Sequence, residues 1–361
     1  MNRRAFLRAG VGVTAGTAVA GCLGEFISEG APAQPPLVQD RPDAVYIPTH
    51  VDGMEMVGMD AVGPYMLSLS YTFAHRFWLV TGRDIRMVEV EGADSVHLMG
   101  TLWERETGVF PPVGSVSMTI RKDGEIVDDR NGWPMLSQTM GFHFGDNVPL
   151  DGDGTYEVEL RVDPLQARQT GAFEGLFDDP ISTTISFDYS ERVRNEIMFQ
   201  LLDDRQGERD AIPPMDMDMP NMDMPMPVSQ LPRENQLPGR LVGEGESGDG
   251  RFLVTVLDEP PTGVDGDGQY LAVSARTPYN RYPLPFMSLS GTLDRGGETV
   301  FDGSLVATVD PDLDYHYGAA IESLESGDEL AISVGAPPQV GRHEGYETAF
   351  LDMDDVEIPV E

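Results

Sequence analysis

The stretch TMGFHFGDN spans residues 139–147, and a related stretch, LDYHYGAAI, spans residues 313–321. Each contains one histidine between two aromatic residues, His143 in the first and His316 in the second, and glycine follows two residues later. Two such stretches in one chain have two explanations. Either both are packing features of a duplicated fold, or both histidines face a ligand.

The second half of the chain repeats the first around these histidines. The offset is 316 − 143 = 173, and at this offset Asp123-Gly124 falls on Gly296-Gly297, so that two predicted hairpin turns coincide. The other coincidences are Thr119 with Thr292, Glu125 with Glu298, and Gly145 with Gly318. After small gaps, ARQTGAF at 167–173 meets GRHEGYETAF at 341–350. A match of turns without a gap over several strands predicts an internal duplication.

The segments around these stretches read as β-strands. YMLSLSYTF, VHLMGTLWE and TYEVELRVD in the first half, and RFLVTVLDE and YLAVSAR in the second, are short runs bounded by turn residues. Gly124 supplies the positive φ that a tight hairpin turn needs. Short strands of this kind are typical of antiparallel sandwiches. We therefore predict an all-β chain with two β-sandwich domains, at residues 46–190 and 241–361, the second a degenerate copy of the first.

Residues 191–240 are expected to join the two domains. Ser190 is placed to cap a short helix running to about Asp204, because Val193, Ile197 and Leu201 recur at a spacing of four. IPPMDMDMPNMDMPMPVSQLP at 212–232 follows, and its low complexity is typical of a segment that does not fold. Its methionines could capture Cu(I) weakly and pass it on, or the segment is a flexible, salt-tolerant linker.

The N-terminus, MNRRAFLRAGVGVTAGTAVAGCLG, has the features of an exported lipoprotein. Arg3-Arg4 begins a twin-arginine pattern, and Val19-Ala20-Gly21-Cys22 resembles a lipobox, so residues 1–22 are predicted to be a signal peptide. Cys22, the only cysteine, is the predicted site of lipid attachment. Residues 23–45 would be a flexible spacer. We expect an extracytoplasmic protein at the cell surface, anchored by lipid to the cytoplasmic membrane.

The strong negative charge excludes some partners. The formal net charge is −37, and Lys122 is the only lysine. Phosphate contacts need cationic side chains, so nucleic acid and anionic membrane surfaces are not expected partners. A halophilic surface, whose acidic groups tolerate high salt, is the simpler interpretation. The alternative is a dedicated acidic surface that binds cations.

The histidines and methionines carry more information than any catalytic motif. No nucleophile elbow, Walker loop, dinucleotide fingerprint or zinc-protease helix is present, so we do not expect an enzyme. A blue-copper centre needs a cysteine ligand, and it is excluded because the only cysteine, Cys22, is assigned to the lipid anchor. His97 and Met99 lie two residues apart on one predicted strand face, and Met135 and Met140 precede His143. Imidazole with thioether favours copper. Each of these residues could equally be a packed core side chain.

The stretch WPMLSQTMGFHFGDN, followed by LDGDGTYEVELRVDP and TGAF, resembles a family of extracytoplasmic metal-binding proteins associated with high-affinity ferrous-iron uptake. The resemblance covers residues 46–190, with a weaker copy over 241–358. It implies immunoglobulin-like β-sandwiches that bind mainly copper, or another divalent metal such as iron, through histidine and methionine. It also implies a membrane permease as partner.

Carried over residue by residue, the resemblance assigns His97, Met135 and His143 as metal ligands, with Met140 as a rival to Met135. Two departures stand out: Met99 replaces an expected glutamate, and Gln169 stands where a later histidine is expected. The second copy has the opposite pattern. It keeps His316 and His343 but has Tyr270 in place of His97 and Thr308 in place of Met135.

The complementary losses suggest a shared site. If the two copies pack as an internal pseudo-dimer, His343 would complete the site of His97, Met135 and His143. A homodimer is the other possible arrangement. His75, in HRFW at 75–78, is a candidate auxiliary ligand, and His50 lies near Met54, Met56 and Met59 in a second region where metal could be handled.

The function that these features favour is a lipid-anchored surface protein for iron or copper acquisition or homeostasis. The alternatives are a metal-free adhesion or ligand-binding module with immunoglobulin-like domains and, third, a copper-dependent redox enzyme.

Overall fold

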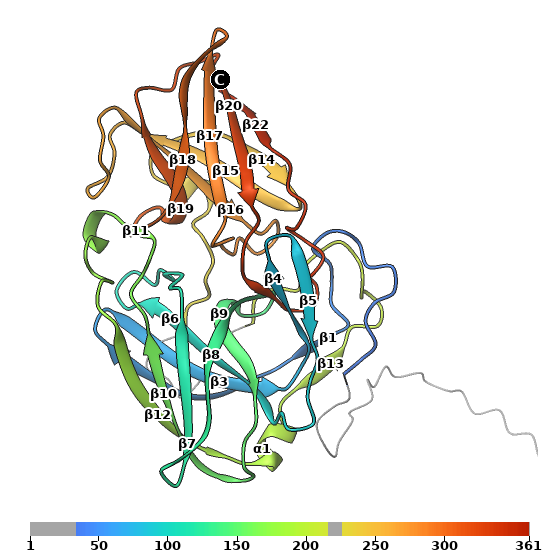
Figure 1. Ribbon diagram of the computed structural model, residues 1–361. Coiled ribbons are helices and arrows are strands. Elements are labelled where there is room, and N and C mark those ends of the chain that lie inside the picture. The colour runs from blue at the N-terminus through green and yellow to red at the C-terminus, as the bar shows by residue number, and fades with distance from the viewer. Residues whose placement is uncertain (1–33, 216–225, 361) are drawn as a thin grey trace, which may run out of the picture.

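The computed structural model describes residues 34–215 and 226–360, and within these ranges the protein is almost entirely β-structure (Figure 1). Two antiparallel sheets each curl toward a closed sandwich, one in each half of the chain. The predicted fold class is confirmed. Cys22 and four of the linker methionines, Met217, Met219, Met222 and Met224, lie outside the described residues.

The first sheet contains most of the strands of the N-terminal half. Its main path runs β12-β10-β7-β8-β9-β6-β3-β2, with β4, β5 and β21 attached beside it. The bounds of its strands are β2 Glu55–Val62, β3 Tyr65–Phe73, β4 Phe77–Thr81, β5 Asp84–Val88, β6 Val96–Glu104, β7 Val116–Lys122, β8 Glu125–Ser137, β9 Gly141–Val148, β10 Gly154–Val162, β12 Ile181–Tyr189 and β21 Gly341–Arg342.

The second sheet has the same order of strands. Its path, β22-β20-β17-β18-β19-β16-β15-β14, matches the first sheet strand for strand. The bounds are β14 Arg240–Ser247, β15 Gly250–Leu257, β16 Gln269–Arg276, β17 Ser288–Arg295, β18 Glu298–Asp310, β19 Asp314–Ile321, β20 Glu329–Ala336 and β22 Val356–Pro359, with β11 Arg168–Gln169 attached to β18. The offset of 173 holds without a gap at β8 and β18, β9 and β19, and β11 and β21.

The two sandwiches exchange short strands. β21, from the second half, pairs in parallel with β8 of the first sandwich, where Gly341 faces Met135. β11, from the first half, pairs in parallel with β18 of the second, where Arg168 faces Thr308. Figure 1 shows the C-terminal segment in red descending beside β4, and β11 rising toward β19. The exchange is therefore reciprocal and related by the same offset of 173.

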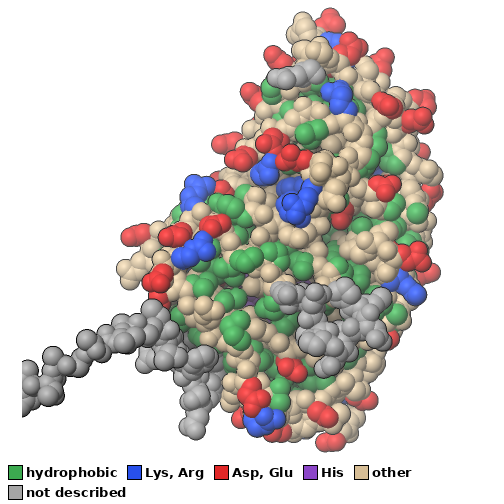
Figure 2. All heavy atoms as spheres, turned by 180° about the vertical axis from the view of Figure 1, so that it is seen from behind, with side chains coloured by type: hydrophobic (Ala, Val, Ile, Leu, Met, Phe, Trp, Pro, Cys, Tyr) green, Lys and Arg blue, Asp and Glu red, His purple; other side chains and the backbone are tan. Residues whose placement is uncertain are grey.

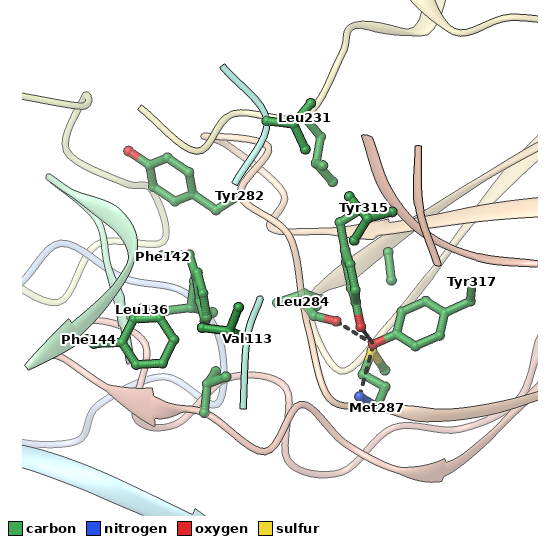
Figure 3. Packing of buried hydrophobic residues seen from close by; sticks show 14 of the residues in the cluster. Val113, Leu136, Phe142, Phe144, Leu231, Tyr282, Leu284, Met287, Tyr315 and Tyr317 are labelled. Carbon is green, nitrogen blue, oxygen red and sulfur yellow. Dashed lines mark hydrogen bonds between the residues drawn. The ribbon is translucent and has the colours of Figure 1, made fainter. Parts of the chain in front are cut away.

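The aromatic residues of the two opening stretches pack in one hydrophobic cluster that continues across both sandwiches (Figure 3). Phe142 and Phe144 come from β9, and Tyr315 and Tyr317 are their counterparts on β19. Tyr317 donates from its hydroxyl to the carbonyl of Leu284 at 2.9 Å. The aromatic residues of both stretches therefore serve packing, which leaves the histidines on the opposite faces of their strands.

The segment after the first sandwich differs from the expected long helix. Ser190 does cap a helix, accepting from the Val193 backbone N–H at 3.2 Å, but α1 is only Glu191–Asn195. β13, Phe199–Leu201, then pairs with β1, His50–Asp52. Strand pairing with β1 has overridden the helical periodicity because it satisfies backbone groups that a solvent-exposed helix end leaves free.

Parts of both presumed flexible segments are packed. Val45, at the end of the expected spacer, is fully buried, and Arg76 donates from Nη1 to the Pro35 carbonyl at 2.6 Å. At the ends of the Met-rich segment, Met226 is buried and Met215 donates its backbone N–H to the Thr139 carbonyl at 2.9 Å. A 3₁₀ turn, η2, Glu234–Gln236, precedes β14, and another, η1, Gly171–Phe173, follows β11.

Acidic side chains are dispersed over the face of the protein that Figure 2 shows. Figure 2 shows Asp and Glu spread over both sandwiches on that face, so the coloured residues there form no single acidic patch. Among the residues that the structure describes, no helix has the length and apolar character needed to cross a bilayer.

Candidate metal centre

Three neighbouring strands of the first sandwich hold the predicted ligands. Met135 on β8 lies directly opposite His143 on β9, and His97 on β6 lies opposite Asn147 on β9. Side chains alternate between the two faces of a strand. Leu98, Phe142 and Phe144 therefore point into the core, and the predicted ligands point to the other face. That face looks toward the segment contributed by the second sandwich.

His343 reaches this face from the other half of the chain. It follows β21, and its backbone N–H donates to the Leu136 carbonyl at 3.0 Å. Its ring centroid lies 5.0 Å from that of His143 and 5.4 Å from that of His97. His75, just after β3, lies 4.2 Å from His97 and 4.8 Å from His343. Four of the six histidines of the chain therefore form one cluster, named here the histidine cluster.

The hydrogen bonds fix which nitrogen of each ring is free. His143 Nδ1 donates to the Gly141 carbonyl at 3.1 Å, and His97 Nδ1 donates to Asn147 Oδ1 at 2.9 Å. A carbonyl oxygen can only accept, so in these neutral rings Nε2 carries no proton. His97 Nε2 and His143 Nε2 are both buried and have no hydrogen-bond partner.

The same reasoning separates His75 from His343. His75 Nδ1 donates to the Phe73 carbonyl at 2.9 Å, so its Nε2 must accept. His343 Nδ1 therefore donates to His75 Nε2 at 3.2 Å, which leaves His343 Nε2 buried without a partner. By distance alone, donor atoms of His75, His97 and His343 lie within 4.8 Å of one another. The hydrogen bonds make His75 a positioning residue and leave the free Nε2 atoms on His97, His143 and His343.

Burial keeps the cluster neutral. Desolvation, the largest cause, lowers the pKa of His75 and of His143 to about 4. It also lowers the pKa values of His97 and His343 well below 6.5, helped by neighbouring imidazoles. A metal takes the neutral form of histidine, so the cluster is in its binding form at pH 7.

Gly145 makes room for His97, which explains the glycine of the opening stretch. A Cβ added at Gly145 would lie 2.6 Å from His97 Nε2. In the second sandwich a Cβ at Gly318 would lie 2.1 Å from the Tyr270 hydroxyl, and Tyr270 is the counterpart of His97. Each glycine therefore clears space for the side chain on the adjacent strand.

The methionines occupy different places around the cluster. Met135 is fully buried opposite His143, and a Cβ at Gly341 would lie 3.1 Å from its Cγ. Met99 and Met140 instead line an adjoining pocket, together with His75 and His343. Met135 is therefore the thioether that shares the strand face of His143, and Met140 belongs to the pocket.

The structure does not bring His316 to the cluster. His316 lies in the second sandwich, where its Nε2 is 2.9 Å from the Tyr270 hydroxyl and its Nδ1 is 3.0 Å from the Asp314 carbonyl. Burial lowers its pKa to about 4, and the charge of Arg168 acts in the same direction. Both ring nitrogens are thus engaged, and a cation already stands nearby.

The sequence alone suggested Gln169 as the equivalent of His343. In the structure the equivalent position is Thr170. The Thr170 backbone N–H donates to the Val309 carbonyl at 3.1 Å, which repeats the bond from His343 to Leu136 at the offset of 173. The Gln169 side chain instead contacts Asp178 and the Phe177 backbone. The β11 register decides this, and β11 was too short to be recognised from its residues.

Sequence reasoning missed two side chains around the cluster. Asn147 holds His97 through Oδ1 and donates from Nδ2 to the His75 carbonyl at 2.9 Å. Glu344 accepts from the Thr49 backbone at 3.0 Å and from Arg76 at 2.6 Å, beside the pocket. The Asn in GFHFGDN was visible in the sequence, whereas nothing in the sequence connects Glu344 with Thr49.

Residues 90–190 match the model of a family described as Fe2+ transport protein. The resemblance found in the sequence is thereby confirmed over these residues, which contain His97, Met135 and His143. Residues 235–359 match a different model, described as a domain of unknown function. The comparison with curated proteins gives no match.

The solved structures that this chain matches in part include two that contain copper. A copper-bound variant of FetP from uropathogenic Escherichia coli is 20% identical, with 38% of this chain and 97% of that chain covered and a TM-score of 0.30. The copper-reconstituted P19 protein from Campylobacter jejuni is 16% identical, with 38% and 96% covered and a TM-score of 0.30. The copper is a property of those two proteins.

Proposed function

We propose that this chain binds copper or iron outside the cytoplasm, through His97, His143, His343 and Met135, and takes part in the acquisition or homeostasis of these metals. The observation that carries the proposal is three buried Nε2 atoms without a partner in one cluster. A buried polar atom left unpaired costs about 1–3 kcal/mol, and coordination to a metal removes that cost.

The donor set favours copper as the resident metal. Three imidazole nitrogens and one thioether sulfur are ligands of intermediate to soft character, which suit copper in either oxidation state better than hard cations. The copper-containing FetP and P19 structures agree with this choice. The Fe2+ transport family match over residues 90–190 supports iron as the metal that the pathway moves.

We propose that the protein binds metal ions by coordination and does not catalyse a reaction. The cluster offers four neutral imidazoles, and one of them, His97, packs against Phe77 and donates to Asn147 Oδ1. Export through the twin-arginine signal and attachment through Cys22 would hold the protein at the outer side of the cytoplasmic membrane, next to a metal permease. Replacing Cys22 with serine should release the protein from the membrane fraction, and retention there would count against the lipid anchor.

Elemental analysis tests the metal. The purified protein is equilibrated with copper, iron and zinc, each alone, and its bound metal is measured for the wild type, His143→Ala and His316→Ala. We expect one equivalent of copper in the wild type and in His316→Ala, and its loss in His143→Ala. A wild-type protein that retains no metal would favour the adhesion or ligand-binding module instead.

The contribution of the second sandwich needs a separate pair of variants. His343→Ala should weaken copper binding as strongly as His97→Ala, because each removes one free Nε2 from the same cluster. Unchanged affinity in His343→Ala would limit the site to the first sandwich.

A further inference from the structure

A pocket opens beside the histidine cluster and is lined by groups that the proposed centre does not use. Its cavity volume is about 80 Å³, and His75 and His343 are among its lining residues. His50, Asp52 and Met54 lie around it as well. The pocket therefore joins the cluster to a second histidine-containing site with a carboxylate.

Strand β1 aims His50 and Asp52 to the same side, since they are two residues apart. The ring of His50 stacks on Phe199 with centroids 5.0 Å apart, and its Nδ1 lies 2.9 Å from Thr49 Oγ1. His50 Nε2 then faces Asp52 Oδ1 at 3.7 Å. This separation is too long for a hydrogen bond, so the two atoms are held near each other without bonding.

One carboxylate oxygen of Asp52 lacks a hydrogen-bond partner. Its Oδ1 is buried and accepts no hydrogen bond. The guanidinium of Arg76, whose charge acts on His50, is committed to Glu344 at 2.6 Å and to the Pro35 carbonyl. Within residues 34–215 and 226–360, the only ion-pair contact of Asp52 is the one with His50. A buried carboxylate without a cation is costly, and a bound cation removes that cost.

The spacing between the two atoms suits one metal ion. Bonds of about 2.0–2.2 Å place two donors of the same ion about 3.0–3.7 Å apart when the angle between them is about 90–120°. One imidazole nitrogen with one carboxylate oxygen suits a borderline divalent ion better than Cu(I). The negative charge of Glu344 next to Asp52 favours a cation further.

We propose that His50 and Asp52 form a second metal position, the outer position, which binds a divalent cation of the Fe2+ class at the mouth of the pocket. Water completes its coordination. The ion held there lies beside His343, on the side of the cluster that the pocket leaves open. The outer position uses none of the ligands assigned to the cluster, so it stands or falls separately from the proposed copper centre.

The test loads the two positions in sequence. The purified protein receives one equivalent of Cu2+ and is then dialysed anaerobically against Fe2+, and both metals are measured. We expect the wild type to retain both. Asp52→Asn should weaken Fe2+ binding at least about tenfold and leave the copper content unchanged. The same result is expected for His50→Phe, a variant that keeps the stacking on Phe199.

Asp314→Asn is the matched control. Asp314 is the other buried aspartate whose pKa desolvation raises to about 7, and it lies in the second sandwich. Its amide variant should keep both metals. Asp52→Asn with normal Fe2+ binding and higher stability would mean that Asp52 is only a buried acid, and would overturn the outer position.

The outcomes separate the two proposals. Copper bound without any Fe2+ in the wild type overturns the outer position and leaves the cluster intact. Fe2+ bound without copper, and lost in both Asp52→Asn and His50→Phe, supports the outer position and overturns copper binding at the cluster.

Discussion

His343 Nδ1, in the second sandwich, donates a hydrogen bond of 3.2 Å to His75 Nε2, in the first. The bond exists because the Phe73 carbonyl holds the proton of His75 on Nδ1. It holds the ring of His343 with its centroid 5.4 Å from that of His97 and 5.0 Å from that of His143, and leaves Nε2 free. A residue in one domain thus orients the candidate ligand supplied by the other.

His75→Ala should weaken copper binding about 10- to 100-fold, because His343 loses the acceptor that holds its ring. His75→Gln restores an acceptor oxygen and should recover most of the affinity. Competition with a copper chelator measures both. If the alanine and glutamine variants bind copper equally, His75 does not act through this bond.

Met135→Leu should selectively weaken Cu(I) binding, because it removes the thioether opposite His143 and almost preserves volume. The stability cost should stay below about 1.5 kcal/mol. Met140→Leu is the control, since Met140 lines the pocket. Titration with Cu(I) under reducing conditions compares them, and a larger loss in Met140→Leu would exchange the two assignments.

Gly145→Ala should displace His97, because the new Cβ would lie 2.6 Å from its Nε2. We expect loss of metal binding together with a destabilisation of about 1–3 kcal/mol from overpacking. Gly92→Ala, where a Cβ meets nothing within 4 Å, is the control. Metal content and urea unfolding report the two effects, and normal copper binding in Gly145→Ala would contradict the assignment of His97.

The metal-free protein should lose stability as the pH falls from about 6.5 to about 4. Burial lowers the folded-state pKa of all six histidines, so below pH 6.5 the unfolded chain takes up protons that the folded chain refuses. Each histidine contributes up to about 1.4 kcal/mol per pH unit in this window.

Raised carboxyl pKa values oppose this trend without reversing it. Burial raises the pKa of Asp52 and of Asp314 to about 7, so their stabilising contribution is lost as the pH rises from about 4 to 7. Burial also raises the pKa values of Asp146 and Glu347. The six histidines outnumber these four carboxyl groups. Urea unfolding at pH 7.5, 6 and 5 checks the direction, with His316→Gln expected to flatten the slope. A midpoint that rises on acidification would refute the prediction.

The duplicated fold could be predicted because the turns at Asp123-Gly124 and Gly296-Gly297 lie at the same offset as the two histidines. In the structure Gly124 and Gly297 both have positive φ, as such turns require. The helix after Ser190 was predicted too long, because local periodicity contains no information about pairing with β1.

The predicted ligands on one strand face followed from alternation alone, since His97, Met135 and His143 sit on strands whose pattern is clear. The complementary loss of histidines pointed to His343. The roles of His75 and Asp52 were not predictable in this way. They depend on contacts such as that between His75 and His343, which are 268 residues apart, and on a proton position set by one carbonyl.

The reciprocal exchange of β11 and β21 has a consequence for how the site responds to dilution. A centre assembled from two separate subunits weakens as the protein concentration falls. Here one covalent chain supplies both halves, so the effective concentration of His343 at the cluster is set by the linker and not by the amount of protein. The copper affinity of this protein should therefore be the same at nanomolar and micromolar protein, with one ion per chain at either extreme.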